Sequence, residues 1–143
     1  MSNTYVLDNS VCIKSIADEE GSKTVEEIMY LKNSYKISLL MPELFSYEFC
    51  STVSRKLNPV AARIALRKII SRQVTLVKME PEIVRIATDL VAKYSGVTFY
   101  DAAYHAVAKY HHILLITADK KYYDKVKQEG NIAMLDKVKV RLD

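Results

Sequence analysis

Residues 113–119 have the sequence ILLITAD, and this stretch decides the fold class. Its four consecutive apolar residues, 113–116, are typical of a strand that is buried on both faces of a sheet. A threonine and an aspartate follow where the strand ends, and a helical stretch is predicted from residue 120. Strands that alternate with helices in this way indicate parallel pairing and right-handed crossovers.

The same alternation continues along the whole chain. Pro42, Pro59 and Pro81 each stand where a helix is predicted to open, and Gly96 and Gly130 stand near predicted helix ends. The sequence therefore predicts an α/β fold, a three-layer α/β/α sandwich with a central parallel sheet. The predicted strands are 4–7, 37–41, 73–79, 113–117 and 131–135, and the predicted helices are 23–35, 42–56, 59–70, 81–96, 99–111 and 120–128.

Length and composition limit the possible classes of protein. The chain has 143 residues, 50% of them hydrophobic and 27% charged, which predicts one domain over residues 1–143 with a core of its own. Its three glycines cannot form a P-loop or a dinucleotide-binding fingerprint. The net charge of +4 permits nucleic acid as a partner without requiring it.

The expected location is the cytoplasm. The first residues lack the pattern of a signal peptide, and no apolar run is long enough to cross a membrane. Cys12 and Cys50 are too few for a disulfide scaffold and do not have the spacing of a zinc motif. We expect free thiols, although the sequence leaves a disulfide between them open.

Two aspartates follow predicted strands. Asp8 comes directly after residues 4–7, and Asp119 comes two residues after the strand that ends at Thr117. Either one alone is explained as the N-cap of the next helix. Because ligands of parallel sheets bind at the carboxyl edge, the two together favour a site there.

Two further acids come from helices. Glu48 lies within the predicted inward-facing stripe of its helix, where a charge is costly unless it is paired or binds a metal. Asp101 lies in the first turns of a helix rich in alanine, with Thr98 as the competing N-cap. The other members of the inward stripe are Leu44, Phe45, Phe49, Thr52 and Val53.

Carboxylates gathered at one point repel one another, and divalent cations relieve the repulsion. Oxygen ligands without a His or Cys set favour Mg²⁺ or Mn²⁺ over zinc. A pair of such ions is suited to phosphodiester hydrolysis. The residues alone thus make a two-metal site one candidate, with Asp8, Glu48, Asp101 and Asp119 as its ligands.

Four strings of the sequence resemble, in order, the successive motifs of PIN-domain proteins, and among them the VapC toxins of toxin–antitoxin pairs. The family shows an apolar strand ending in Asp, a Pro with Glu six residues later, an Asp-Ala helix start, and Thr-x-Asp after a strand. The matching strings are YVLDNSV (5–11), MPELFSYEFCSTV (41–53), TFYDAAYHAVAKY (98–110) and LLITADKKYY (114–123).

The resemblance implies an endoribonuclease that depends on Mg²⁺ or Mn²⁺. Asp8, Glu48, Asp101 and Asp119 match its catalytic and metal-binding acids. The resemblance also implies three residues that hydrogen-bond a carboxylate or the substrate: Ser10, Thr117 and Asn9, the last standing where Thr is common. The implied partners are RNA, a second copy of the chain in a homodimer, and an antitoxin whose helix enters an apolar groove.

Other polar and aromatic residues have two interpretations each. His105 shares a helix face with Asp101, but we expect a structural role. The tyrosines beside the acidic motifs are expected mostly to pack, although one could stack on a base; they are Tyr100, Tyr104, Tyr122 and Tyr123. Two groups of basic residues form either solvated faces or a phosphate-binding rim: Arg63, Arg67, Lys68 and Arg72, and Lys120, Lys121, Lys125 and Lys127.

Two alternatives to a nuclease remain at this point. The first is a PIN-like module that binds RNA or protein without cleaving it, and the complete set of four acids argues against it. The second is a doubly wound domain that accepts a phosphoryl group on aspartate. That domain would need paired acids after the first strand, where only Asp8 stands.

Overall fold

The computed structural model describes residues 3–138, and its centre is a five-stranded sheet with the order β3-β2-β1-β4-β5. All four neighbouring pairs are parallel. Each predicted strand is present; the first has the predicted bounds, and the other four are shorter or shifted by a residue. The strands are β1 (Thr4–Leu7), β2 (Ser38–Pro42), β3 (Val74–Val77), β4 (Leu114–Thr117) and β5 (Ile132–Met134).

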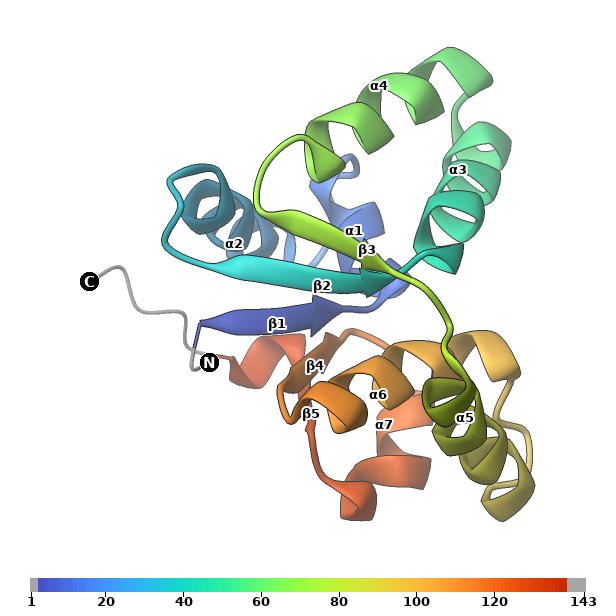
Figure 1. Ribbon diagram of the computed structural model, residues 1–143. Helices are drawn as coiled ribbons and strands as arrows, with labels where there is room; N and C mark the ends of the chain where they lie inside the picture. Colours follow the sequence, from blue (N-terminus) through green and yellow to red (C-terminus); the bar gives the residue numbers. More distant parts are fainter. Residues whose placement is uncertain (1–2, 139–143) are drawn as a thin grey trace.

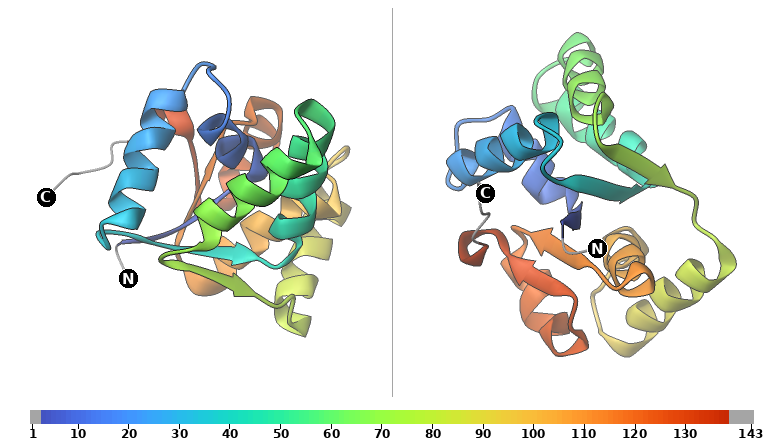
Figure 2. Two further views of the ribbon diagram at one scale, coloured as in Figure 1. Left: turned by 90° about the horizontal axis from the view of Figure 1, so that it is seen from above. Right: turned by 60° about the vertical axis from the view of Figure 1, so that its left-hand side comes forward.

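Helices cover both faces of the sheet, so the predicted three-layer α/β/α fold is confirmed. Figure 1 shows α1–α4 on one side and α5–α7 on the other, and the right-hand view of Figure 2 shows the same division. The chain moves outward from β1 to β3 and then returns to the other side of β1, where it forms β4 and β5. Because right-handed crossovers that run in opposite directions lie on opposite faces, the two halves of the chain place their helices on different sides of the sheet. The helices are α1 (Asn9–Cys12), α2 (Ser22–Asn33), α3 (Leu44–Lys56), α4 (Pro59–Ile70), α5 (Pro81–Lys93), α6 (Phe99–His111) and α7 (Lys120–Val126), with the 3₁₀ turns η1 (Ile13–Ser15), η2 (Lys127–Glu129) and η3 (Leu135–Lys137).

The prediction that Pro42 opens a helix is wrong, because Pro42 is the last residue of β2 and pairs with Val77. The register between β1 and β2 ends at Leu39, so the missing N–H of Pro42 faces no strand ladder. The predicted end of α5 near Gly96 is also wrong. The helix ends at Lys93, and Gly96, with φ of 81°, lies in the turn before α6.

Helix α6 lies closest to the sheet. All of its residues from 102 to 108 are buried, and it packs on β1, β2 and β4. Small side chains allow this close approach, as the alanine-rich sequence predicts. The alanines are Ala102, Ala103, Ala106 and Ala108. This packing fixes the start of the helix, and therefore Asp101, relative to the carboxyl ends of the strands.

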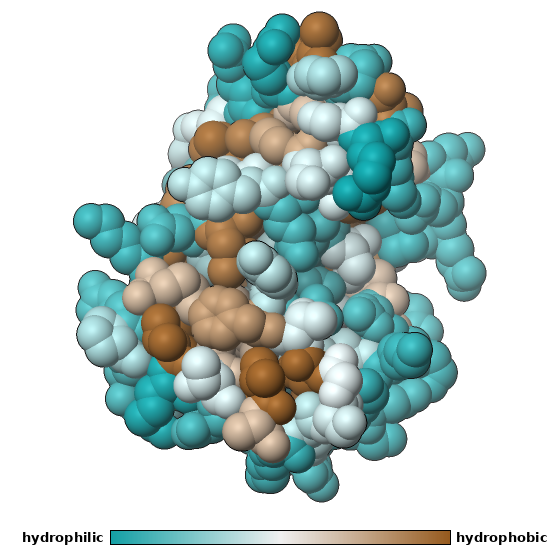
Figure 3. Space-filling model, turned by 90° about the vertical axis from the view of Figure 1, so that its right-hand side faces the viewer, coloured by the Kyte–Doolittle hydropathy of each residue, from teal (hydrophilic) through white to brown (hydrophobic). Residues whose placement is uncertain are grey.

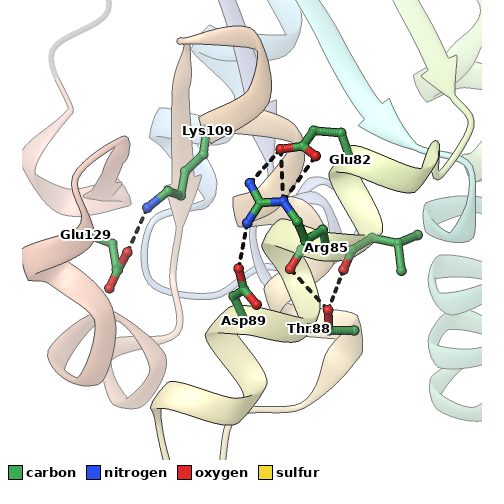
Figure 4. Close-up of polar contacts among 7 residues, drawn as sticks. Glu82, Arg85, Thr88, Asp89, Lys109 and Glu129 are labelled. Atoms are coloured by element: carbon green, nitrogen blue, oxygen red, sulfur yellow. Dashed lines mark hydrogen bonds and ion pairs between the residues drawn. The ribbon is translucent and has the colours of Figure 1, made fainter.

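The other end of α6 is held by an ion pair from Lys109 to Glu129 of η2 (Figure 4), and Lys93 of α5 pairs with the same carboxylate. The carboxylate of Glu129 accepts hydrogen bonds from Lys109 Nζ at 2.7 Å, from Lys93 Nζ at 2.8 Å and from the Tyr94 hydroxyl. These bonds, the one from Lys109 first, lower the pKa of Glu129 to about 2. Because the Glu129 side chain is only 12% exposed, the cluster joins three elements more firmly than a surface ion pair would.

Candidate active site

Asp8 and Asp119 lie at the carboxyl ends of two neighbouring strands. Strand β1 pairs with β4 through Leu7 and Ile116, and the amide of Asp8 continues this pairing by donating to Ile116 O at 3.0 Å. The connections from these two strands lead in opposite directions across the sheet, from β1 to β2 and from β4 to β5. This is the switch point at which parallel sheets bind their ligands.

Glu48 and Asp101 reach the same place from helices on the two faces of the sheet, α3 and α6. All four acids line one pocket of about 370 Å³, here called the acidic pocket. The structure thus brings together the four carboxylates that the sequence predicted. The inward stripe predicted for α3 is partly correct, since Phe45, Phe49 and Val53 are buried and Glu48 is half-buried at its edge.

Two hydroxyls hold Asp8 in place. Ser10 Oγ donates to Asp8 Oδ2 at 2.6 Å, and Thr117 Oγ1 donates to the same oxygen at 3.1 Å. Each hydroxyl also accepts a backbone N–H, Ser10 from Ala118 and Thr117 from Asp119. These bonds tie the end of β1 to the turn after β4, and they leave Asp8 Oδ1 without a side-chain donor among the described residues.

Glu48 is oriented by a residue from the opposite layer. The hydroxyl of Tyr104, on α6, donates to Glu48 Oε1 at 2.6 Å across the carboxyl edge of the sheet. Sequence analysis placed Tyr104 beside the acidic motifs and predicted packing for it. Its ring is indeed buried, but the bond to Glu48 was missed because it joins two helices, α3 and α6, that are separated in the chain by α4, β3 and α5.

Asp101 and Asp119 stand at the beginnings of helices. Thr98 is the N-cap of α6, with its side chain accepting from the amide of Asp101, so Thr98 and not Asp101 is the cap. Asp119 is the N-cap of α7, where its Oδ1 accepts from the Tyr122 amide at 3.0 Å. Asp119 therefore serves as a cap and as a wall of the acidic pocket at the same time.

Burial and mutual repulsion raise the pKa of three of these carboxyls. Burial is the largest cause for Asp8, with smaller contributions from the charges of Glu48 and Asp119. Burial also raises the pKa of Glu48, followed by repulsion from Asp101. For Asp101, burial and then the charges of Asp8 and Asp119 raise the pKa to about 6.

A divalent cation fits this donor set. Carboxylate oxygens are the ligands that Mg²⁺ and Mn²⁺ prefer, and a positive charge would relieve the repulsion that raises these pKa values. Over residues 3–138, no three Asp, Glu, His or Cys side chains already lie together as a formed metal-binding group. The residues therefore match the ion in chemistry, and their side chains would have to converge to bind it.

Asn9 has different surroundings from those predicted, whereas His105 has the structural position that was expected for it. Asn9 donates from Nδ2 to Thr52 Oγ1 at 3.3 Å, and its buried Oδ1 has no hydrogen-bond partner among the described residues. It lines the acidic pocket but forms no hydrogen bond to a carboxylate of residues 3–138. His105 is fully buried and bonds to Tyr122 Oη and Gly130 O, which confirms a structural position for it.

The basic residues of the pocket are not those that the sequence singled out. Lys14 and Lys56 line it, and Lys14 pairs with Glu19 at 3.2 Å. None of the eight residues predicted as a rim lines it: Arg63, Arg67, Lys68 and Arg72 belong to α4 and the turn after it, and Lys120, Lys121, Lys125 and Lys127 belong to α7 and η2. The rim interpretation thus finds no support in the lining of this pocket, and most of the eight residues are exposed, as the interpretation as solvated faces expects.

Both cysteines are free thiols, Cys12 being buried and Cys50 half-buried. No helix in the described part of the chain has the length and apolar character needed to cross a membrane.

The fold and the site define a class: parallel α/β proteins in which carboxylates from strand ends and helices meet at the switch point of the sheet. The family model described as the PIN domain matches residues 5–128, and the chain belongs to the PIN domain family. A comparison with curated proteins gave no significant match.

Several solved structures share this fold. The DNA-bound VapBC complex from Salmonella typhimurium has a TM-score of 0.72 and 14% identity, over 94% of this chain and 99% of that chain. The VapC20 structure from Mycobacterium tuberculosis, described as a sarcin-ricin loop cleaving toxin, has a TM-score of 0.67 and 15% identity, over 86% and 97%. The FitAcB structure from Neisseria gonorrhoeae has a TM-score of 0.65 and 14% identity, over 94% and 99%.

Proposed function

We propose that this protein is a VapC-like endoribonuclease of the cytoplasm that hydrolyses RNA phosphodiester bonds with Mg²⁺ or Mn²⁺. The proposal rests on one observation: a single pocket at the switch point is lined by the four acids Asp8, Glu48, Asp101 and Asp119. The similarity to VapC structures supports it, as does membership of the PIN domain family.

Each side chain of the pocket has a definite part in this proposal. Bound there, one or two Mg²⁺ or Mn²⁺ ions would activate a water molecule and neutralise charge on the phosphate oxygens. Ser10 and Thr117 hold Asp8 so that Oδ1 stays available to a ligand. Tyr104 does the same for Glu48 by occupying only Oε1. Asn9, within the pocket, is proposed to contact the substrate.

The first test is cleavage of a mixed pool of structured RNA by the purified protein. We expect cutting with Mn²⁺ or Mg²⁺, none with EDTA, and none with Asp8→Asn or Asp101→Asn. Asp89→Asn, at an exposed aspartate of α5, is the matched control and should cut normally. Products should carry 5′-phosphates, which separates this activity from contaminating nucleases that leave 2′,3′-cyclic phosphates.

Calorimetric titration with Mn²⁺ separates a narrow substrate range from a lack of catalysis. Binding that is lost in Asp101→Asn supports the metal site even if the RNA pool contains no substrate. Absence of both binding and cleavage would favour the alternative, a PIN-like module that binds RNA or protein without cutting.

An antitoxin is the proposed partner, and an apolar groove offers it a place. The groove, of about 440 Å³, lies between η1, α2 and α4 and is lined by Ile16, Met29, Ile64 and Ile69 among others. Ile64 is 54% exposed although it is apolar. A partner helix would cover such a surface. Ile64→Glu should therefore escape inhibition by the antitoxin and retain cleavage.

A homodimer is also part of the proposal. Figure 3 shows apolar side chains gathered on the side of the molecule that carries α3 and α5. Val84 and Val91 lie on one face of α5. Val84 is half-buried, Val91 is 36% exposed, and Leu76 on the edge strand β3 is 38% exposed. Light scattering should give the mass of a dimer, and Val91→Glu should give a monomer. Val60→Glu, at an exposed valine of α4, is the control.

A further inference from the structure

A second pocket adjoins the acidic pocket and shares Glu48 and Thr52 with it. Its volume is about 450 Å³, within the range of about 300–1,000 Å³ that small ligands occupy. One face of α3 forms most of its wall, and Tyr100 at the start of α6 completes it. We call it the tyrosine pocket, after Tyr47 and Tyr100.

The fold does not explain these two tyrosines. Tyr47 is 75% exposed and Tyr100 is 59% exposed, so both forgo the stabilisation that a buried aromatic ring provides. Neither hydroxyl has a hydrogen-bond partner within residues 3–138. Each tyrosine directly precedes a carboxylate of the acidic pocket, Glu48 or Asp101.

The remaining wall has the chemistry of a nucleotide site. Arg55 lies two helical turns after Tyr47 on the same face of α3, and Ser51 lies between them. An aromatic face accepts any base by stacking, a guanidinium contacts phosphate oxygens, and a hydroxyl can bond a base edge. Leu44 closes the pocket with an apolar side chain.

We propose that the tyrosine pocket is a base-binding subsite for single-stranded RNA, occupied by a base next to the phosphate that is cleaved. This inference rests on the proposed nuclease function. RNA bases stack on both Tyr47 and Tyr100, Arg55 contacts a neighbouring phosphate, and the shared Glu48 places the nucleotide beside the acidic pocket. Stacking tolerates every base, so the subsite strengthens binding and adds little sequence preference.

The test measures binding without cleavage, in Asp101→Asn protein with EDTA present. The probes are a fluorescent 12-nucleotide single-stranded RNA and a strand of the same length whose central nucleotides are abasic. Tyr47→Leu and Tyr100→Leu keep apolar bulk and remove the aromatic face, whereas Tyr47→Phe keeps it. Tyr30→Leu, at a tyrosine of α2 that is 64% exposed, is the matched control.

Each leucine variant at the pocket should bind the intact strand roughly 5- to 100-fold more weakly. Binding of the abasic strand should not change, Tyr47→Phe should restore affinity, and Tyr30→Leu should bind as the parent does. An equal loss on both strands, or no loss, overturns the inference.

Three further results separate this inference from its alternatives. If the leucine variants bind RNA normally but become monomers by light scattering, the pocket belongs to an interface with a second copy and the inference fails. If the wild-type protein cleaves RNA while the leucine variants bind normally, the subsite is refuted and the nuclease stands. If the parent protein binds neither strand and the wild type cleaves nothing, both proposals fail together.

Discussion

Replacing Asp101 with Asn should stabilise the metal-free protein. Asp101 is partly buried beside Asp8 and Asp119, and these surroundings raise its pKa from 3.8 to about 6. A carboxyl whose folded-state pKa is raised destabilises the fold once it ionises. The penalty is therefore absent below pH 3.8, grows as the pH rises towards 6, and is constant above that.

The size of the effect follows from the shift. A pKa unit corresponds to about 1.4 kcal/mol, so a shift of this size corresponds to at most about 3 kcal/mol at neutral pH, and solvent screening of the partly exposed carboxyl makes the effect smaller. The first turn of α6 favours a negative charge by up to about 1 kcal/mol, which asparagine loses. We expect a net gain of about 1–3 kcal/mol, or roughly 3–10 °C in the melting temperature of a chain of this length.

Urea unfolding in EDTA at pH 7.5 and at pH 4 measures this gain. Asp101→Asn should exceed the wild type at pH 7.5, and the difference should nearly disappear at pH 4. Asp89→Asn, which removes an exposed carboxylate, should show no such gain at either pH. A loss of stability in Asp101→Asn that is equal at both pH values would refute the repulsion and show that the carboxylate mainly supports the start of α6.

Three more substitutions test the contacts that hold α6 and Asp8 in place. Glu129→Gln should lose about 1–3 kcal/mol at pH 7 in urea unfolding. Because the folded-state pKa of Glu129 is low, this difference should shrink as the pH falls below 4.5. His105→Ala should lose about 2–4 kcal/mol through the cavity and the lost bond to Tyr122. Burial lowers the pKa of His105, so thermal melts should show the loss shrinking as the pH falls below 6.5. Thr117→Val removes a donor to Asp8 and should cost about 1–2 kcal/mol in urea unfolding at pH 7.

The strands and most helix starts could be predicted because single residues or short runs determine them. Leu115 and Ile116 are each 1% exposed, as an apolar run in a covered sheet requires. Pro59 opens α4 after the cap of Asn58, whose side chain accepts from the Ala61 amide. The prediction for Pro42 was wrong because a proline that opens a helix and a proline that ends a strand can have the same local sequence. Only the register of β1 against β2 distinguishes them.

The positions of the acids could be predicted, but the contacts that orient them could not. Asp8 and Asp119 follow strands, and strand ends in a parallel sheet meet at one edge. The bond from Tyr104 to Glu48 joins two helices on opposite faces of the sheet, and no periodicity within either helix reveals it. Lys14 and Lys56 were overlooked for the same reason, because the packing of α1, η1 and α3 sets their direction.

Helix α6 carries both a group that destabilises the fold and the contacts that stabilise it. Its first turn carries Asp101, whose charge opposes folding near neutral pH. Its buried middle packs on three strands, and its last turns are held by Lys109 and Glu129. A site that crowds carboxylates needs such support elsewhere, since the repulsion is relieved only when a cation binds.

If this is correct, Asp101→Asn and Glu129→Gln should change stability in opposite directions and by independent amounts, because the two groups lie at opposite ends of the helix. A double variant whose stability departs clearly from the sum of the two would show that the ends of α6 are coupled.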